Sequence, residues 1–325
     1  MRQLLLPVAL LLSACSTLSQ DQRDQLATCQ RNALLYFDGG RLDQAMGQVE
    51  RGLALNPDDY KLNALRGAIL LRTSPTASGT DHQQLDAATT ILAKVYGERS
   101  AARHEPYLLT NYALALQKQG MRRESEALRL EGRATRAVGD EQQTLLTTAK
   151  ELRQQRAAVL AQANELLGVL LERGNVPRLA HNHRAQIALQ LQDEAAFLTE
   201  SKAYFEQAAK DQAAVQREID QTTIAAYEAD QRRLLQSLRS EELELRGLLA
   251  EVRFRRHEWA EVVAQLNRVL EIDPARTEDY YNRGRAQLEL GQLDAAKDDF
   301  RRFLVDPARP ATDEKVLFAA QVLKR

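Results

Sequence analysis

Two consecutive stretches of 34 residues, 243–276 and 277–310, place small and apolar side chains in the same phase. A sequence period of this length is the signature of a repeat architecture, in which each unit buries its apolar face against its neighbours. The period therefore limits the chain to a stack of similar units. In the second stretch the pattern consists of Tyr280, Arg283, Gly284, Gly291, Ala296, Phe300, Phe303 and Pro307. In the first stretch it consists of Leu249, Ala250, Trp259, Leu266, Val269, Asp273 and Pro274.

A third unit lies near the N-terminus, over about residues 24–59. Small side chains at Ala33 and Ala45 allow two antiparallel helices to approach closely, and two glycines at 39–40 supply the turn between them. Two degenerate units follow. One begins at Tyr60 and includes a loop over 73–81 and a helix over about 85–96, and the other is best formed over 111–120 and departs from the pattern after Arg122. The pattern of the unit over 24–59 consists of Cys29, Ala33, Tyr36, Gly40, Ala45, Val49, Gly52, Asn56 and Pro57.

Over residues 24–137 and 243–310 these units resemble the tetratricopeptide-repeat family. The resemblance implies an all-α fold, a helical solenoid of antiparallel helix pairs, with a capping helix over 309–325. The composition agrees, because 15 glycines and 8 prolines in 325 residues leave long stretches suited to helices. We therefore expect N-terminal repeats over 24–139 and a C-terminal repeat pair with its cap over 243–325.

The middle of the chain, residues 140–242, does not keep the 34-residue period. An apolar stripe with spacings of four and three predicts a long helix that ends at Gly174, and the run from Pro177 contains no further glycine or proline until Gly247. We expect a coiled-coil-like hairpin of long helices over 140–173 and 178–242, with at least one break. Two interpretations stay open: the hairpin completes the solenoid, or it pairs with another chain. The stripe consists of Leu145, Ala149, Leu152, Arg156, Val159, Ala163, Leu166 and Leu170.

The first residues have the layout of an export signal. A basic Arg2 precedes an apolar run over 4–12, which is shorter than the roughly 20 residues that span a bilayer. The following Ser13, Ala14 and Cys15 complete a sequence that resembles the bacterial lipobox, and the alternative is an ordinary secretory signal with an incidental cysteine. The resemblance implies a signal peptide over 1–14 and a lipidated (palmitate-bearing) Cys15 followed by a linker to 23. Ser16 favours the outer membrane over the inner one.

The charge balance and the motifs argue against several classes of function. The 44 basic and 45 acidic side chains nearly cancel, so there is no electrostatic case for nucleic acid. The paired histidines His181 and His183 lie two positions apart and do not share a helix face, so we expect no metal site. No cofactor or catalytic motif occurs, and we expect no enzyme. Cys29 is expected as a buried core residue, with a reactive role as the alternative.

The resemblance to the repeat family also implies where a partner binds, because the inner helix of each repeat lines a groove in that family. Position by position, this gives a protein-binding set that mixes aromatic, apolar and charged groups, as suits a helix or extended segment of a partner. The lysine and asparagine of the carboxylate clamp found in chaperone-binding members are missing at the matching positions. The set consists of Leu34, Phe37, Tyr107, Glu251, Phe254, Tyr281 and Arg285.

The sequence therefore predicts a protein-binding scaffold or adaptor, anchored to the outer membrane through its lipid and facing the periplasm. Its partners would be other envelope proteins, in a secretion, pilus, outer-membrane or peptidoglycan machine. Two alternatives stay open, a solute-binding accessory lipoprotein of a transporter and a structural coiled-coil spacer. An open groove of mixed polarity would favour the scaffold, whereas a deep apolar cavity would favour solute binding.

Overall fold

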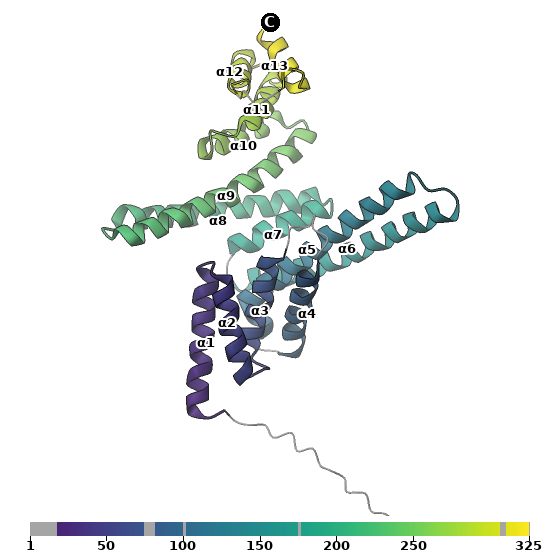
Figure 1. The fold of residues 1–325 in the computed structure, drawn as a ribbon. Helices are drawn as coiled ribbons and strands as arrows, with labels where there is room; N and C mark the ends of the chain where they lie inside the picture. The colour runs from purple at the N-terminus through teal and green to yellow at the C-terminus, as the bar shows by residue number, and fades with distance from the viewer. Residues whose placement is uncertain (1–17, 75–81, 100–101, 175–176, 306–309, 325) are drawn as a thin grey trace, which may run out of the picture. The chain divides into compact units, whose positions relative to one another are not determined.

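The computed structural model describes residues 18–74, 82–99, 102–174, 177–305 and 310–324. Cys15 and the export signal lie outside these ranges, so their expected roles stay predictions. The described residues form helices and contain no strand, which confirms the all-α fold class (Figure 1). The elements are α1 (Gln20–Asp38), α2 (Leu42–Leu55), α3 (Tyr60–Thr73), α4 (Gln83–Glu98), the short 3-10 helix η1 (Ala102–His104), α5 (Pro106–Ala134), α6 (Asp140–Glu172), α7 (Pro177–Gln190), α8 (Glu194–Gln221), α9 (Ala225–Arg255), α10 (Trp259–Ile272), α11 (Thr277–Glu289), α12 (Leu293–Phe303) and α13 (Glu314–Leu323).

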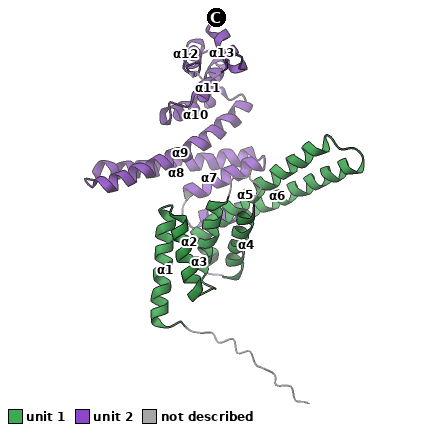
Figure 2. Ribbon diagram, viewed as in Figure 1, with its two compact units in different colours: residues 1–163 green, residues 164–325 purple. Residues whose placement is uncertain are grey.

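The chain divides into two compact units, residues 1–163 and 164–325, coloured separately in Figure 2. In the first unit, α1 pairs with α2 and α3 pairs with α4. The first helices of successive pairs also touch each other, since α3 contacts both α1 and α5. These three helices, α1, α3 and α5, therefore form one side of the unit, and the candidate site lies on that side.

Small residues let the helices of the first unit cross closely, as the sequence pattern predicts. Ala33 and Ala45 have no exposed surface, and a methyl group added to Gly67 would lie 2.7 Å from Leu92 Cγ of the partner helix. Gly40 makes the turn between α1 and α2 with φ of +71°, a value that glycine adopts without strain. Glycine and alanine therefore occur where two backbones approach or reverse.

The repeat period is visible in the backbone as well as in the sequence. The residue after α2, Asn56, has φ −140° and ψ 92°, and the residue after α10, Asp273, has φ −138° and ψ 90°. Both precede a proline in the turn that leads to the next helix. The turns that follow α9 and α11 also match, because His257 (φ 58°) and Gly291 (φ 74°) stand 34 positions apart. The N-terminal and C-terminal repeats therefore share local geometry.

The unit that is best formed over 111–120 ends on a glycine without a turn. At Gly120 α5 continues as a single helix to Ala134. Gly120 instead provides room for another helix, since a methyl group there would lie 2.9 Å from Leu160 Cδ2 of α6. The chain reverses later, at Gly139 with φ of +63°, and α6 returns along α5.

The hairpin of α5 and α6 also corrects the expected pairing of the middle section. The C-terminal half of α6 does meet the expected partner, since Asn164 accepts a hydrogen bond from Arg184 of α7 over 3.1 Å. The N-terminal half instead packs Leu145 and Ala149 on an apolar stripe of α5. Arg153 of α6 completes the contact through ion pairs with Glu124 and Glu131 of α5. The five-residue connection 135–139 is long enough for this antiparallel pairing with the preceding helix.

The second unit stacks each helix on its neighbours in sequence, from α7 to α13. The long helices α8 and α9 form a second hairpin (Figure 1), closed by a cluster of Val215, Ile219, Leu235 and Leu238. Further along, α11 and α12 cross at Gly284, where Phe300 Cε1 would lie 3.0 Å from an added methyl group. The expected capping helix is present as α13 and packs on α12.

Buried charge joins three helices of this second unit. The carboxylate of Glu242 accepts hydrogen bonds from Gln212 of α8, Arg246 of α9 and Arg268 of α10. Burial raises the pKa of Glu242, but these hydrogen bonds outweigh burial and hold its pKa below the ordinary value. The side chain therefore stays ionised and connects the hairpin to the C-terminal repeats.

Candidate protein-binding pocket

The first helices of the three N-terminal pairs line a pocket of about 410 Å³ that opens to solvent on one side. Residues from α1, α3 and α5 contribute to its wall, together with the residue immediately before α5. Most of the wall is apolar, and the polar groups lie among Gln30, Arg31, Lys61 and Glu105. The lining consists of Gln30, Arg31, Leu34, Tyr60, Lys61, Leu62, Ala64, Leu65, Glu105, Tyr107 and Leu108.

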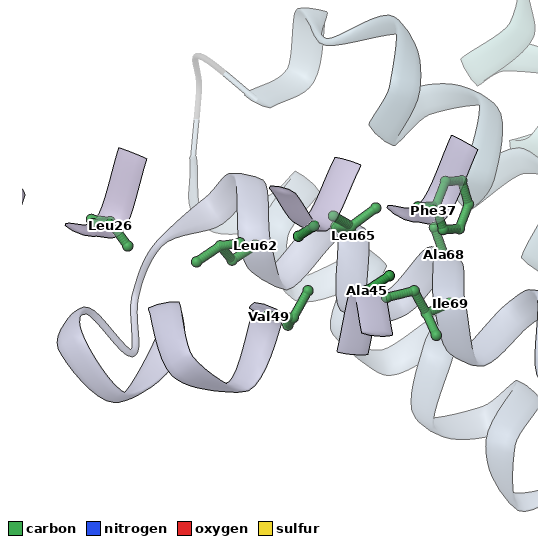
Figure 3. Packing of buried hydrophobic residues seen from close by; sticks show 9 residues of the cluster. Leu26, Phe37, Ala45, Val49, Leu62, Leu65, Ala68 and Ile69 are labelled. Atoms are coloured by element: carbon green, nitrogen blue, oxygen red, sulfur yellow. The ribbon is translucent and has the colours of Figure 1, made fainter. Parts of the chain in front are cut away.

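The floor of the pocket is the core of the first repeats. Leu62 and Leu65 line the pocket and also belong to the buried cluster in Figure 3, in which α1, α2 and α3 meet. Tyr107 packs against this cluster, with its ring centroid 5.7 Å from that of Phe37 in an edge-on arrangement. Side chains fixed by a packed core lose little further freedom when a ligand binds, so the pocket is preformed.

Two tyrosines hold their hydroxyl groups protonated beside the pocket. Burial raises the pKa of Tyr107 far above its ordinary value, and no described residue bonds to its hydroxyl group. Burial also raises the pKa of Tyr60, with the carboxylate of Glu105 adding to the effect, and the Tyr60 hydroxyl donates to that carboxylate over 3.4 Å. Neither phenol can act as an anion near neutral pH. Tyr107 therefore contributes contact surface, and the Tyr60 hydroxyl acts as a hydrogen-bond donor.

The structure brings two of the predicted binding residues together at this pocket. Leu34 stands at the edge with 45% of its surface exposed, and Tyr107 forms part of the wall. Phe37 was expected to line the groove as well, but only 2% of its surface is exposed and it belongs to the core cluster beneath. The reason is its position on α1, one turn beyond Leu34, where α3 and α5 close over the helix and Arg72 lies 3.8 Å above the ring.

The other four predicted residues belong to the second unit. Glu251 is exposed and Phe254 is half-buried, with its ring 4.9 Å from that of Trp259. Tyr281 is corrected from a groove position to a core position, because only 7% of its surface is exposed. It packs between α12 and α13, and its ring lies 5.0 Å from Phe303 and 6.2 Å from Phe318.

Arg285 lies one turn along from Tyr281 and is also engaged within the fold. Its guanidinium group stands 5.0 Å from the ring of Phe318 in α13 and 6.0 Å from that of Phe254. Phe318 therefore contacts both Tyr281 and Arg285, the two predicted groove residues of the last repeat. Lys315 of the same helix forms an ion pair with Glu278 over 2.6 Å. The capping helix therefore occupies the surface that the repeat pattern assigned to a partner.

Several pocket residues were not singled out in the sequence. Lys61 and Ala64 are 34 positions after Ala27 and Gln30, so the repeat period itself assigns them to the inner face of α3. They were missed because inner-helix positions were assigned only in the better-formed units, and the unit that begins at Tyr60 is degenerate. Glu105 carries no such signal, since it precedes α5 and belongs to no repeat position.

The histidine and acidic side chains of the described residues form no candidate metal site. In these ranges no group of three or more histidine, cysteine, aspartate or glutamate side chains is placed to hold a metal ion. His181 instead meets Glu200, with Nδ1 2.6 Å from Oε2, and Arg184 reaches the same carboxylate over 3.1 Å. None of the described helices is both long and apolar enough to cross a membrane.

The fold and the pocket define a helical-repeat protein with an open inner surface. No protein-family model and no curated protein matches the sequence. Among solved structures, the chain is similar to a tetratricopeptide repeat protein from Parabacteroides merdae, with 14% identity over 93% of this chain and 100% of that one and a TM-score of 0.37. It is also similar to the tetratricopeptide-repeat domain of P58(IPK), with 16% identity over 94% of this chain and 90% of that one and a TM-score of 0.26.

Proposed function

We propose that this chain is a protein-binding scaffold of the bacterial envelope, tethered by a lipid on Cys15, and that its first unit binds a segment of a partner protein. The open pocket between α1, α3 and α5 is the observation that carries the binding role. An apolar floor with a polar rim is the arrangement of protein-recognition surfaces, in which a few buried side chains supply most of the affinity. No catalytic step is part of this proposal.

The shape of the pocket favours a protein segment over a small solute. A solute-binding protein needs a cavity that encloses most of its ligand. The pocket here is partly open to solvent and the exposed Leu34 belongs to its lining, so a longer chain can enter it without being enclosed. Repeats stacked side by side extend such a surface in one direction, which suits an extended or helical segment.

Two adjacent leucines provide the test of the binding site. Leu34 and Leu35 are both exposed, at 45% and 61%, but only Leu34 lines the pocket. A photo-crosslinking amino acid at position 34 should capture a defined envelope protein in intact cells, and the same group at 35 should capture it much less. Leu34→Arg should abolish capture by a crosslinker placed at Lys61, whereas Leu35→Arg should not. Equal capture from both leucine positions would contradict the pocket as the binding site.

The lipid tether rests on the sequence Leu12-Ser13-Ala14-Cys15 and on the apolar run before it. Cys15→Ala should abolish labelling of the protein with radioactive palmitate and release it from the membrane fraction. Cys29→Ala provides the matched control, because Cys29 is a buried residue of α1 and should leave labelling unchanged. Persistent labelling of the Cys15 variant would refute the tether without affecting the pocket.

A further inference from the structure

Glu105, which lines the pocket, and Asp59, which bonds to the pocket residue Gln30, already have partners within the fold. Both oxygens of Asp59 are engaged: Oδ1 accepts from the backbone N–H of Leu62 over 2.9 Å, and Oδ2 accepts from Gln30 Nε2 over 2.8 Å. Glu105 accepts the Tyr60 hydroxyl and directly precedes α5, where the positive end of the helix dipole stabilises a carboxylate. Neither acid needs a cation from a partner.

The basic groups at the same pocket have no acidic partner. Arg31 on α1 and Lys61 on α3 are both exposed and line the pocket, and no carboxylate of the described residues lies within ion-pair distance of either. Arg31 makes a long hydrogen bond of 3.4 Å to the Thr28 hydroxyl group of its own helix. Other basic side chains of this unit do reach acids, as Arg122 does with Asp86 over 2.7 Å. The unmatched charge at the pocket is therefore positive.

We propose that the partner segment carries an apolar side chain flanked by carboxylates. This inference rests on the proposed function and adds the chemistry of the partner to it. The apolar side chain enters between Leu34 and Tyr107, and acidic residues within one turn of it lie against Arg31 and Lys61. Burial of the apolar group supplies most of the affinity, whereas the charges orient the segment and select it over basic ones.

Three synthetic peptides of equal length test the assignment on the full chain. The first has one phenylalanine flanked by glutamates, the second has lysines in place of the glutamates, and the third has alanine in place of the phenylalanine. We expect the first peptide to bind at least tenfold more tightly than the other two in fluorescence anisotropy. Its affinity should fall as salt rises, because exposed charges are screened. Equal binding of the glutamate and lysine peptides would overturn the inference.

Charge reversal on the protein provides the second arm of the test. The double variant Arg31→Glu with Lys61→Glu should reverse the preference toward the lysine peptide. Arg23→Glu with Arg66→Glu is the matched control, because it changes the same two helices by the same charge at exposed residues outside the pocket. The control should bind within about twofold of the unaltered chain. An equal loss in both double variants would assign the effect to net charge and overturn the proposed contacts.

The outcomes separate the two proposals. If no peptide binds but crosslinking at Leu34 still captures a partner, the acidic preference is wrong and the binding site stands. If the peptides fail and the crosslinks at Leu34 and Leu35 are equal, the proposed function fails together with the inference. All four substituted basic residues are exposed, so the variants should keep the far-UV circular dichroism of the unaltered chain.

Discussion

Replacing Gly67 with alanine tests whether helix crossings in the first unit need the missing side chain. In a free helix interior this change stabilises by about 1 kcal/mol, because alanine has the higher helix propensity. At Gly67 the new methyl group would lie 2.7 Å from Leu92 Cγ and 2.9 Å from Leu92 Cδ2, both closer than real contacts allow. Overpacking of this kind costs about 1–3 kcal/mol. We therefore expect Gly67→Ala to be destabilising by up to about 2 kcal/mol.

Gly47 supplies the matched control for this experiment. It lies in the interior of α2, and a methyl group there would meet nothing within 4 Å. Gly47→Ala should therefore raise the free energy of unfolding by about 0.5–1 kcal/mol. Urea denaturation followed by far-UV circular dichroism measures both changes. A Gly67 variant as stable as the Gly47 variant would refute the close crossing of α3 and α4.

Making Gly67→Ala in a Leu92→Ala variant tests whether Leu92 causes the loss of stability. Leu92 is fully buried, and Leu92→Ala should itself cost about 2–5 kcal/mol while removing the atoms that the new methyl group would meet. In that background Gly67→Ala should become stabilising, as at Gly47. The difference between the two backgrounds is the coupling free energy of the pair. A coupling near zero would show that another contact, and not Leu92, limits this position.

Two further predictions concern the second unit. Tyr281→Ala should cost about 3 kcal/mol of stability, since the ring is buried between Phe300, Phe303 and Phe318. Glu251 is exposed, so Glu251→Ala should change the stability by less than about 0.5 kcal/mol. Equal thermal stability of the two variants would contradict the core position of Tyr281. Burial lowers the pKa of His183 to about 4, whereas an unfolded histidine protonates near pH 6.5, so the free energy of unfolding should fall as pH drops from about 6.5 toward 4. His183→Gln should flatten that part of the stability profile measured by urea titration across pH, and an unchanged slope would assign the effect to another group.

The sequence predicted the repeats because tight turns and close helix crossings require glycine or alanine at particular positions. Gly40 and Gly291 turn the chain with positive φ, and Ala33, Ala45 and Ala296 allow close helix crossings. Such positions appear in a single sequence as glycine and alanine at fixed spacing. The helix pairs at both ends of the chain and the capping helix α13 followed from these signals.

The parts that the sequence did not predict depend on longer-range packing. Gly120 has the appearance of a turn residue, but it provides room for Leu160 of α6, and no local signal separates the two roles. Tyr281 occupies a groove position by its repeat number, but its exposure depends on where Phe318 of α13 lies. The pocket was only partly predicted, since Leu34 and Tyr107 follow from the repeat pattern whereas the unpaired state of Arg31 and Lys61 can be read only from the fold.

In the first unit, α5 runs as one uninterrupted helix from the pocket to the tip of its hairpin with α6. Its N-terminal turn places Tyr107 and Leu108 in the pocket wall, and its last turns place Leu130 and Ala134 in the core of the hairpin with α6. A helix of 29 residues is about 43 Å long at 1.5 Å per residue. Any tilt imposed at the pocket is therefore magnified at the other end, so that a rotation of about 5° moves the hairpin tip by about 4 Å. A partner that tilted α5 at the pocket would therefore also displace α6, which is joined to α5 by the ion pairs of Arg153.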